Sequence, residues 1–454
     1  MARSPNTALR DMIQRSGASH KALAHRINRL APHDSPTAYT HTSIANWVER
    51  GMRPKPPAPQ LLATALSERL GRRVTLSEIG LAGTEPTDDH VGLAFPRSLP
   101  AALQTAGAFW STMDRRHFLT AFSAAAFGPP TLRWLSQSTD GTAAHTGGRR
   151  IGRADITELS ELAEQARHSD SRFGGASAGV SAVAVCLRDV AAPMLEGTYT
   201  DDVGKELFSA TAVLGRLAGW ADFDAGHHAR AQRQFIQALR MSRAAGDVAL
   251  GGYVLSCMAL QACLRGYRDD ALDMIEAANA ATPHTPPRVR AFLSLVEARV
   301  HARAHRPKAA GKALAASERL LEQADSRTGD DPTWIDFYTG ARLAADAVEI
   351  HRDLGRPAAA LRWNEKATMP ADRFARSYGI RMAVVSSAHL QAGDLDAALP
   401  TAHTSVDILG RVASRRAHDY LDDLVGRFDR WRSEPGVQGL AERIGAGCPP
   451  RASV

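Results

Sequence analysis

Four short stretches in the first eighty residues carry apolar side chains at helical spacing. Gly17, Gly51 and Gly71 follow three of these stretches as helix stops, and the hydroxyl of Ser19 can cap the second helix. With residues 74–81 added, the pattern predicts a small domain of four helices. Its apolar positions are Leu9, Met12 and Ile13 in residues 7–16; Leu23, Ala24, Ile27 and Leu30 in residues 20–30; Ile44, Trp47 and Val48 in residues 40–50; and Leu61, Leu62, Ala65, Leu66 and Leu70 in residues 61–70.

The third stretch has a polar face as well as an apolar one. Ser43, Asn46 and Arg50 are spaced at i, i+3 and i+7 and therefore share one side of a helix. A hydroxyl, an amide and a guanidinium can hydrogen-bond to base edges in the DNA major groove. Arg53 and Lys55 follow among prolines as a stiff basic exit. The stretch predicts a DNA-recognition helix, and an ordinary solvated helix face is the alternative.

From residue 155 onward the chain predicts one helix after another, with a repeated pattern of small residues. The first two copies have the relative spacing of a tetratricopeptide motif, and the later three are weaker. Small Gly and Ala residues let paired helices approach closely, and each pair leaves an apolar face that its neighbour must cover. We therefore expect a curved array with a concave surface. The repeated positions are Gly226, Ala231, Phe235 and Ala238; Gly266, Ala271, Ile275, Ala278 and Pro283; His305, Ala310 and Leu314; Gly355, Ala360 and Ala367; and Gly393 and Ala398.

Between these two regions, residues 84–150 are punctuated by Pro, Gly and polar residues and predict a linker. Arg115, Arg116, Phe118 and Leu119 open an apolar run that has the form of a twin-arginine export signal. Such signals are N-terminal, so we expect an internal apolar helix at about residues 113–135 that packs on the repeats; a second start at Met113 is the alternative. Residues 435–454 are expected to form a flexible tail.

The charge is concentrated at one end of the chain. The net charge of all 454 residues is +7, and residues 1–80 alone hold twelve Lys and Arg against five Asp and Glu. The remaining residues therefore balance to zero. A basic module beside a neutral body is typical of a phosphate-binding domain, although a solvated basic N-terminus is the alternative.

The N-terminal residues also carry a family resemblance. Lys21–Ala24 (KALA) followed by Ser43–Pro54 (SIANWVERGMRP) resembles the xenobiotic-response-element type of helix-turn-helix, over roughly residues 5–81. One departure is that the connection between the two motif helices is about ten residues longer than the usual tight turn. The resemblance implies base contacts from Thr42, Ser43, Asn46 and Arg50, and phosphate contacts from Ser19, His20, Lys21, Arg53 and Lys55.

A second resemblance covers nearly the whole chain. Several short motifs resemble a family of actinobacterial regulators that join this helix-turn-helix to a tetratricopeptide-like body, some of them implicated in sporulation and antibiotic production. The motifs are Asp170–Gly175 (DSRFGG), Leu217–Trp220 (LAGW), Asp224–Gly226 (DAG), Ala231–Gln232 (AQ), Gln237–Leu239 (QAL) and Ala245–Asp247 (AGD).

Motifs for catalysis are absent: the sequence has no GxGxxG after a strand, no GxxxxGK[ST] and no HExxH. We expect no enzyme activity, no cofactor and no metal, including at His227 and His228. The four cysteines form no CxxC and are expected to be reduced core thiols. The remaining aromatic residues could line a ligand groove, but aromatics at helical spacing are more often core: Trp220, Tyr253, Tyr267, Trp334, Tyr338 and Trp363.

The sequence thus predicts an all-α protein with a helix-turn-helix domain at residues 1–83 and a tetratricopeptide-like α-solenoid at residues 151–434. We expect a cytoplasmic, homodimeric regulator of transcription that binds double-stranded DNA and senses a peptide, metabolite or partner protein. The alternative is an interaction scaffold whose N-terminal domain docks a protein rather than DNA. No run of about 18 apolar residues predicts a membrane span.

Overall fold

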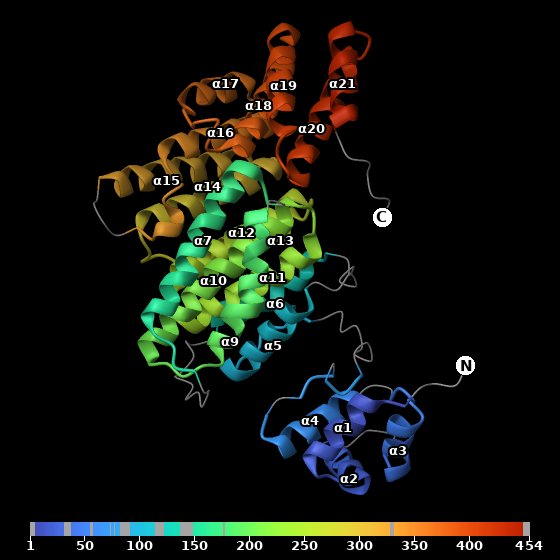
Figure 1. Cartoon of the computed structure of the whole chain (residues 1–454). Helices are drawn as coiled ribbons and strands as arrows, with labels where there is room; N and C mark the ends of the chain where they lie inside the picture. The colour runs from blue at the N-terminus through green and yellow to red at the C-terminus, as the bar shows by residue number, and fades with distance from the viewer. Residues whose placement is uncertain are drawn as a thin grey trace. The chain divides into compact units, whose positions relative to one another are not determined.

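The computed structural model separates the chain into two units, Met1–Asp89 and His90–Val454. The first unit has one cluster of buried hydrophobic residues and the second has two. Figure 1 draws both units, and each is described by itself. The structure describes residues 5–30, 38–54, 58–72, 74–76, 78–81, 91–113, 122–136, 149–175, 178–326 and 331–447.

The N-terminal unit consists of four helices around a core of buried Leu, Ile, Val, Ala and Trp side chains. The first helix ends at Gly17, which adopts a left-handed conformation (φ +62°). Glycine adopts this conformation without strain because it has no Cβ atom. Ser19 caps the second helix, because its Oγ accepts a hydrogen bond from the Ala22 amide at 3.2 Å. The helices are α1 (Thr7–Ser16), α2 (His20–Leu30), α3 (His41–Glu49) and α4 (Ala58–Leu70).

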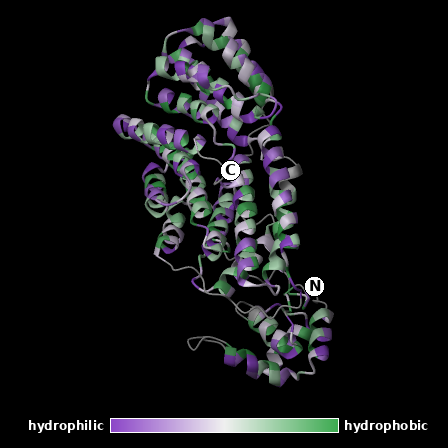
Figure 2. Cartoon of the chain, turned by 90° about the vertical axis from the view of Figure 1, so that its left-hand side faces the viewer, coloured by the Kyte–Doolittle hydropathy of each residue, from purple (hydrophilic) through white to green (hydrophobic). Residues whose placement is uncertain are grey.

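The second unit is dominated by antiparallel helix pairs that stack side by side. Both hydrophobic and hydrophilic segments occur within the same helices, as expected where one face of each helix packs on a neighbour (Figure 2). The five pairs are α10 (Asp201–Asp224) with α11 (His228–Ala245), α12 (Val248–Leu264) with α13 (Arg268–Ala281), α14 (Pro287–Arg303) with α15 (Pro307–Asp325), α16 (Gly340–Asp353) with α17 (Pro357–Lys366), and α18 (Ala375–Gln391) with α19 (Leu395–Leu409).

The repeated positions of the sequence lie at equivalent places in these pairs. Each turn between the two helices of a pair contains one residue with positive φ: Gly226, Gly266, His305, Gly355 and Gly393. Each second helix then buries one alanine completely near its start: Ala231, Ala271, Ala310, Ala360 and Ala398. The predicted all-α class, with helix pairs stacked into a solenoid-like array, is confirmed for the described part of the chain, which contains no strand beyond one isolated bridge at Arg150 and Thr198.

Shorter helices precede the pairs, and two helices follow them. The preceding elements are α5 (Leu99–Thr112), the 3-10 turn η1 (Ala124–Phe127), α6 (Gly128–Ser136), α7 (Arg153–Phe173), α8 (Ala178–Cys186), the π-helical turn η2 (Leu187–Ala191) and α9 (Ala192–Leu195). The 3-10 turn η3 (Thr333–Ile335) precedes α16, and α20 (Arg415–Arg427), the 3-10 turn η4 (Asp429–Trp431) and α21 (Pro435–Gly447) end the unit.

Part of the region predicted as a linker is packed into the second unit. Phe95, Phe109 and Trp110 belong to its main core. The carbonyl oxygens of Val91 and Gly92 accept hydrogen bonds from Arg233 Nε and Gln237 Nε2 of α11 at 2.9 and 2.7 Å. Gly and Pro punctuation in this segment therefore marks a strap, residues 91–97, that lies against α11, because polar side chains of that helix satisfy its backbone.

Residues 124–136 also pack into the second unit, where α6 contacts α11 and α13. Trp134 is buried there against Gly251 of α12. The paired arginines Arg115 and Arg116 lie outside the described residues.

The expected flexible tail differs from the structure over its first thirteen residues. Residues 435–447 form α21, which packs on α19 and buries Val437, Leu440 and Ile444. Residues 448–454 lie outside the described part. In that part, none of the helices combines the length and the apolar character that crossing a bilayer requires.

Candidate functional site

The helix α3 begins with a reciprocal cap. The Oγ1 of Thr40 accepts from the Ser43 amide at 3.4 Å, and the Ser43 Oγ accepts from the Thr40 amide at 3.2 Å. This capping box satisfies two backbone donors that the first turn of a helix otherwise leaves without partners. The Ser43 hydroxyl is therefore used in holding the helix start, and Ser43 itself is half-buried.

The long connection before α3 is closed by a side-chain clamp. Asn28 of α2 donates from Nδ2 to the Tyr39 carbonyl and accepts from the Tyr39 amide through Oδ1, both at 2.8 Å. Tyr39 then packs edge-on against Trp47 with 5.7 Å between ring centroids. The connection differs in length from a tight helix-turn-helix turn, yet its last residues are held on α2 as a short turn would hold them.

The predicted apolar face of α3 packs inward, with Ile44, Trp47 and Val48 buried in the core of the unit. Thr42 is exposed and Asn46 is half-buried. Arg50 is exposed but lies one residue beyond the helix end, where its amide donates to the Asn46 carbonyl at 3.2 Å.

The residues predicted to contact phosphates lie on α2 and after α3. Ser19, Lys21 and Arg53 are exposed, and His20 is half-buried. Lys55 lies outside the described residues. Since α2 and α3 pack against each other, the two predicted sets come from neighbouring elements of one unit.

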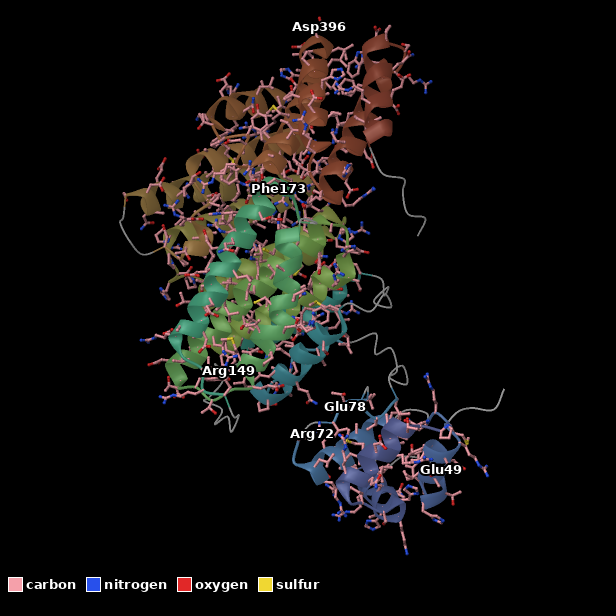
Figure 3. The ribbon with its side chains drawn as sticks, viewed as in Figure 1. Glu49, Arg72, Glu78, Arg149, Phe173 and Asp396 are labelled. Carbon is pink, nitrogen blue, oxygen red and sulfur yellow. The ribbon has the colours of Figure 1, made fainter. Side chains whose placement is uncertain are left out.

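Three arginines of the unit are held in exposed ion pairs, and Figure 3 labels Glu49, Arg72 and Glu78 from two of them. The pairs are Arg10 with Glu49 (2.8 Å), Arg26 with Glu68 (2.6 Å) and Arg72 with Glu78 (2.8 Å). They use three of the five carboxylates that residues 1–80 contain. Among the described residues, Lys21, Arg50 and Arg53 have no ion pair, so their charges face solvent.

A second candidate site is a cavity of about 140 Å³ inside the helical array. The first helix of every pair lines it, together with α7 and α20, and the second helices of the pairs contribute none of its described lining residues. Trp220, Tyr253, Phe292 and Phe337 supply aromatic wall. Sequence spacing favoured core positions over a ligand groove for Trp220 and Tyr253. Both line this cavity, and Tyr253 is buried in the core as well.

The other aromatic candidates lie elsewhere. Trp334 stacks on Tyr253 from outside the lining, with 5.0 Å between ring centroids. Tyr338 is completely buried in the core, Tyr267 is exposed, and Trp363 stacks near His351.

Buried ion pairs join distant parts of the chain around the cavity. Arg376 of α18 binds Asp170 of α7 at 2.7 Å and Asp224 of α10 at 2.9 Å, and Arg416 of α20 binds Asp224 at 3.0 Å. At the same end of α7, the Phe173 carbonyl, on the residue labelled in Figure 3, accepts from the Ala413 amide at 3.0 Å. These contacts hold the two ends of the repeat array together.

Glu349 is the second centre of charge. Arg299 and Arg303 bind its carboxylate at 2.6 and 2.8 Å, and the Tyr420 hydroxyl donates to it at 2.6 Å. Burial alone would raise the pKa of Glu349, but the surrounding arginines outweigh burial and hold this pKa well below its ordinary value. Burial raises the pKa of the Tyr420 hydroxyl to about 12, so it stays a donor.

The described cysteines lie in the packed interior, and the exposed His227 faces a carboxylate. Cys186, Cys257 and Cys263 are free and buried, and burial raises the pKa of the Cys257 thiol to about 11. His227 and Arg230 contact Asp222. No group of three or more metal-ligating side chains is found in the described ranges.

The fold and these two sites define a helical-repeat protein with a separate, basic four-helix unit at its N-terminus. Residues 9–82 match a family model described as the SP15 N-terminal domain. The match falls within the first structural unit and spans α1 to α4. Comparison with curated proteins and with solved structures gave no match.

Proposed function

We propose that the chain is a sequence-specific DNA-binding regulator of transcription whose helical array senses a small ligand. The single observation that carries the proposal is the outward side of α3 on a basic unit. There Thr42 of α3 is exposed, and Arg50 and Arg53 are exposed in the segment that follows the helix. The helix α3 packs against α2, which carries the exposed Lys21. Charges without protein partners are suited to phosphate and base contacts.

We assign the predicted residues to two roles. Thr42, Asn46 and Arg50 are assigned to base edges, whereas Ser43 remains in the helix cap. Ser19, His20, Lys21, Arg53 and Lys55 are assigned to the phosphate backbone. The N-terminal unit is called the head below, and the helical array the body. Two heads make twice the phosphate contacts of one, so a homodimer is the proposed assembly.

Regulation would follow from a population shift. A ligand that binds one arrangement of the array more tightly than another changes the fraction of molecules whose heads are spaced for DNA. The strap at residues 91–97, which is fixed to α11, is the first described segment of the second unit in the sequence.

A salt titration of DNA binding by the full-length protein tests the proposal. Sites enriched from a random duplex pool are compared with a scrambled duplex by fluorescence anisotropy. DNA reading predicts a log–log salt slope that corresponds to several released counterions and a preference of at least about 10³-fold for the enriched site. Absence of any enriched site, or a flat salt dependence, would refute it.

The second candidate function is an interaction scaffold whose N-terminal unit docks a protein. The long α2–α3 connection favours it, because the connection departs from the turn of DNA-binding helix-turn-helix domains. A scaffold predicts neither an enriched DNA site nor a steep salt slope.

A further inference from the structure

The charges that line the cavity do not balance. Seven arginines contribute to its wall, and three carboxylates do so. All three carboxylates are engaged: Asp170 by Arg376, Asp346 by Arg299 and Arg342, and Glu349 by Arg299. Two further arginines turn to carboxylates outside the lining, since Arg167 binds Asp336 and Arg416 binds Asp224.

Arg216 of α10 is left without a counter-charge. It is 5% exposed, and no carboxylate among the described residues lies within ion-pair distance of it. Its Nε is buried with no hydrogen-bond partner, and its Cζ lies 5.1 Å from the centre of the Tyr253 ring. Arg381 of α18 also lines the cavity with a buried, unpartnered Nε, although its Nη1 donates to the Ala367 carbonyl.

A buried guanidinium in this state is costly. The weak attraction of an aromatic ring does not replace an anion beside a buried charge. The wall therefore has two cations, Arg216 and Arg381, to which no carboxylate of the described residues binds, and an anion that entered the cavity would supply the missing counter-charge. Planar carboxylates match the fork of a guanidinium group.

The remaining wall restricts the body of such an anion. Trp220, Tyr253, Phe292 and Phe337 line the space with ring faces and edges. The volume of about 140 Å³ is close to that of an apolar cavity that accommodates benzene. Bare inorganic anions would leave these apolar walls without contacts, and a long peptide would not fit.

We propose that the cavity binds a small organic acid, with one carboxylate and an apolar body about the size of an aromatic ring, and that Arg216 supplies the counter-charge. This inference gives a chemical class to the effector and rests on the proposed function only in that respect. Binding itself involves the helical array alone.

The test uses the full-length protein without DNA. Phenylacetate and indole-3-acetate are titrated by calorimetry, each beside its primary amide, which has nearly the same shape and no charge. We expect saturable binding of at least one acid, with its amide about 10- to 100-fold weaker. Equal binding of acid and amide, or binding of inorganic phosphate alone, would overturn the proposal. So would no saturable binding of either acid up to about 10 mM, a weak but measurable range.

Arg216→Met removes the charge and keeps an apolar side chain of similar length. We expect it to weaken acid binding by about 10- to 100-fold and to raise the melting temperature of the ligand-free protein, because an uncompensated buried charge is removed. Arg319→Met, at an exposed position of α15, is the matched control and should change neither the affinity for the acid nor the melting temperature. A lower melting temperature together with unchanged acid binding would assign Arg216 a structural role only and reject the proposal.

Ala345→Leu provides a second variant that keeps Arg216. Ala345 lines the cavity from α16, so the added isopropyl group of leucine occupies the space of the ligand. Loss of acid binding with a native circular dichroism spectrum is expected, and unchanged affinity would place the acid elsewhere. These assays contain no DNA, so a negative result for acid binding does not affect the test of DNA binding. A negative result for DNA binding likewise does not affect the test of acid binding.

Discussion

Asp224 shows how a single carboxylate can connect distant parts of this chain. It is completely buried at the end of α10, where it accepts from the Gly175 amide and binds both Arg376 and Arg416. Burial works to raise its pKa, and the two arginines outweigh burial and hold the pKa below its ordinary value. The contacts join α7, α10, α18 and α20 through charge rather than through apolar packing alone.

Arg376→Met should destabilise the array by about 3–5 kcal/mol, because it leaves Asp170 and Asp224 with fewer counter-charges in a buried site. The free energy of unfolding from urea titrations measures this loss. Adding Asp170→Asn to the variant should recover part of it. A change below about 1 kcal/mol for Arg376→Met would mean that the network contributes little.

His228 gives the array a defined response to acid. Burial, and then the charges of Arg265 and His227, lower its pKa from the ordinary 6.5 to about 4, so the folded chain holds this histidine neutral where the unfolded chain protonates it. Its contribution to stability is therefore complete above pH 6.5 and is lost as pH falls toward 4. Thermal melts between pH 7 and 4 should show a shallower decline for His228→Gln than for the wild type. His284→Gln, at an exposed position, is the control, and identical declines in all three would contradict the account.

Among the elements, the inter-helix turns are the part that the sequence predicts best. Small residues, mostly glycine, recur at the turns between the two helices of a pair, although the intervals between them are unequal. The structure gives the turn residues a positive φ. His305 occupies the same position as four glycines, and it is the non-glycine residue with positive φ in the described part of the chain. The backbone requirement is therefore stronger than the identity of the residue.

His305→Gly should stabilise the α14–α15 turn by up to about 1 kcal/mol, because relief of the left-handed strain exceeds the added freedom of the unfolded chain. Gly393→Ala imposes the reverse change at the α18–α19 turn. No atom lies within 4 Å of the added carbon there, so the loss, also about 1 kcal/mol, is purely a backbone effect. Urea unfolding measures both changes. Equal signs for the two substitutions would contradict the assignment of the turns.

The helix α11 illustrates what periodicity did not predict. Its residues Gln232, Arg233, Gln237 and Arg240 have the polarity of a solvated face, yet all four are buried. Their side chains bind carbonyl oxygens of the strap and of Ser123, which lie more than a hundred residues earlier in the chain. Local pattern does not specify such a partner. For the same reason the sequence did not show which arginines of the repeats lack a counter-charge, since ion pairing depends on contacts between distant helices.

The cap of α3 separates a structural role from a recognition role. Thr40→Ala removes the side-chain acceptor at the helix start and should cost about 1 kcal/mol of stability in the N-terminal unit.

Ser43→Ala should weaken binding to the enriched DNA site and to scrambled DNA alike, because its hydroxyl holds the helix rather than a base. Anisotropy on both duplexes measures this. A selective loss on the enriched site would return Ser43 to the base-contacting set.

At the scale of the whole molecule, the chain combines a basic four-helix unit with a long helical array that is nearly neutral in net charge. The sequence predicted the fold class, the four N-terminal helices and the pairing of the array. It did not predict that residues 91–113 and 435–447 pack into the second unit. The proposed division of labour between a DNA-binding head and a ligand-binding body depends on the head reading base sequence.

The specificity ratio of Arg50→Ala tests that claim most directly. Affinities of the full-length wild type, Arg50→Ala and Lys21→Ala are measured for the enriched and the scrambled duplex at three salt concentrations. We predict that Arg50→Ala loses about 1–3 kcal/mol on the enriched duplex and little on the scrambled one, while Lys21→Ala weakens both alike and reduces the salt slope by about one. An equal loss on both duplexes for Arg50→Ala would contradict the account.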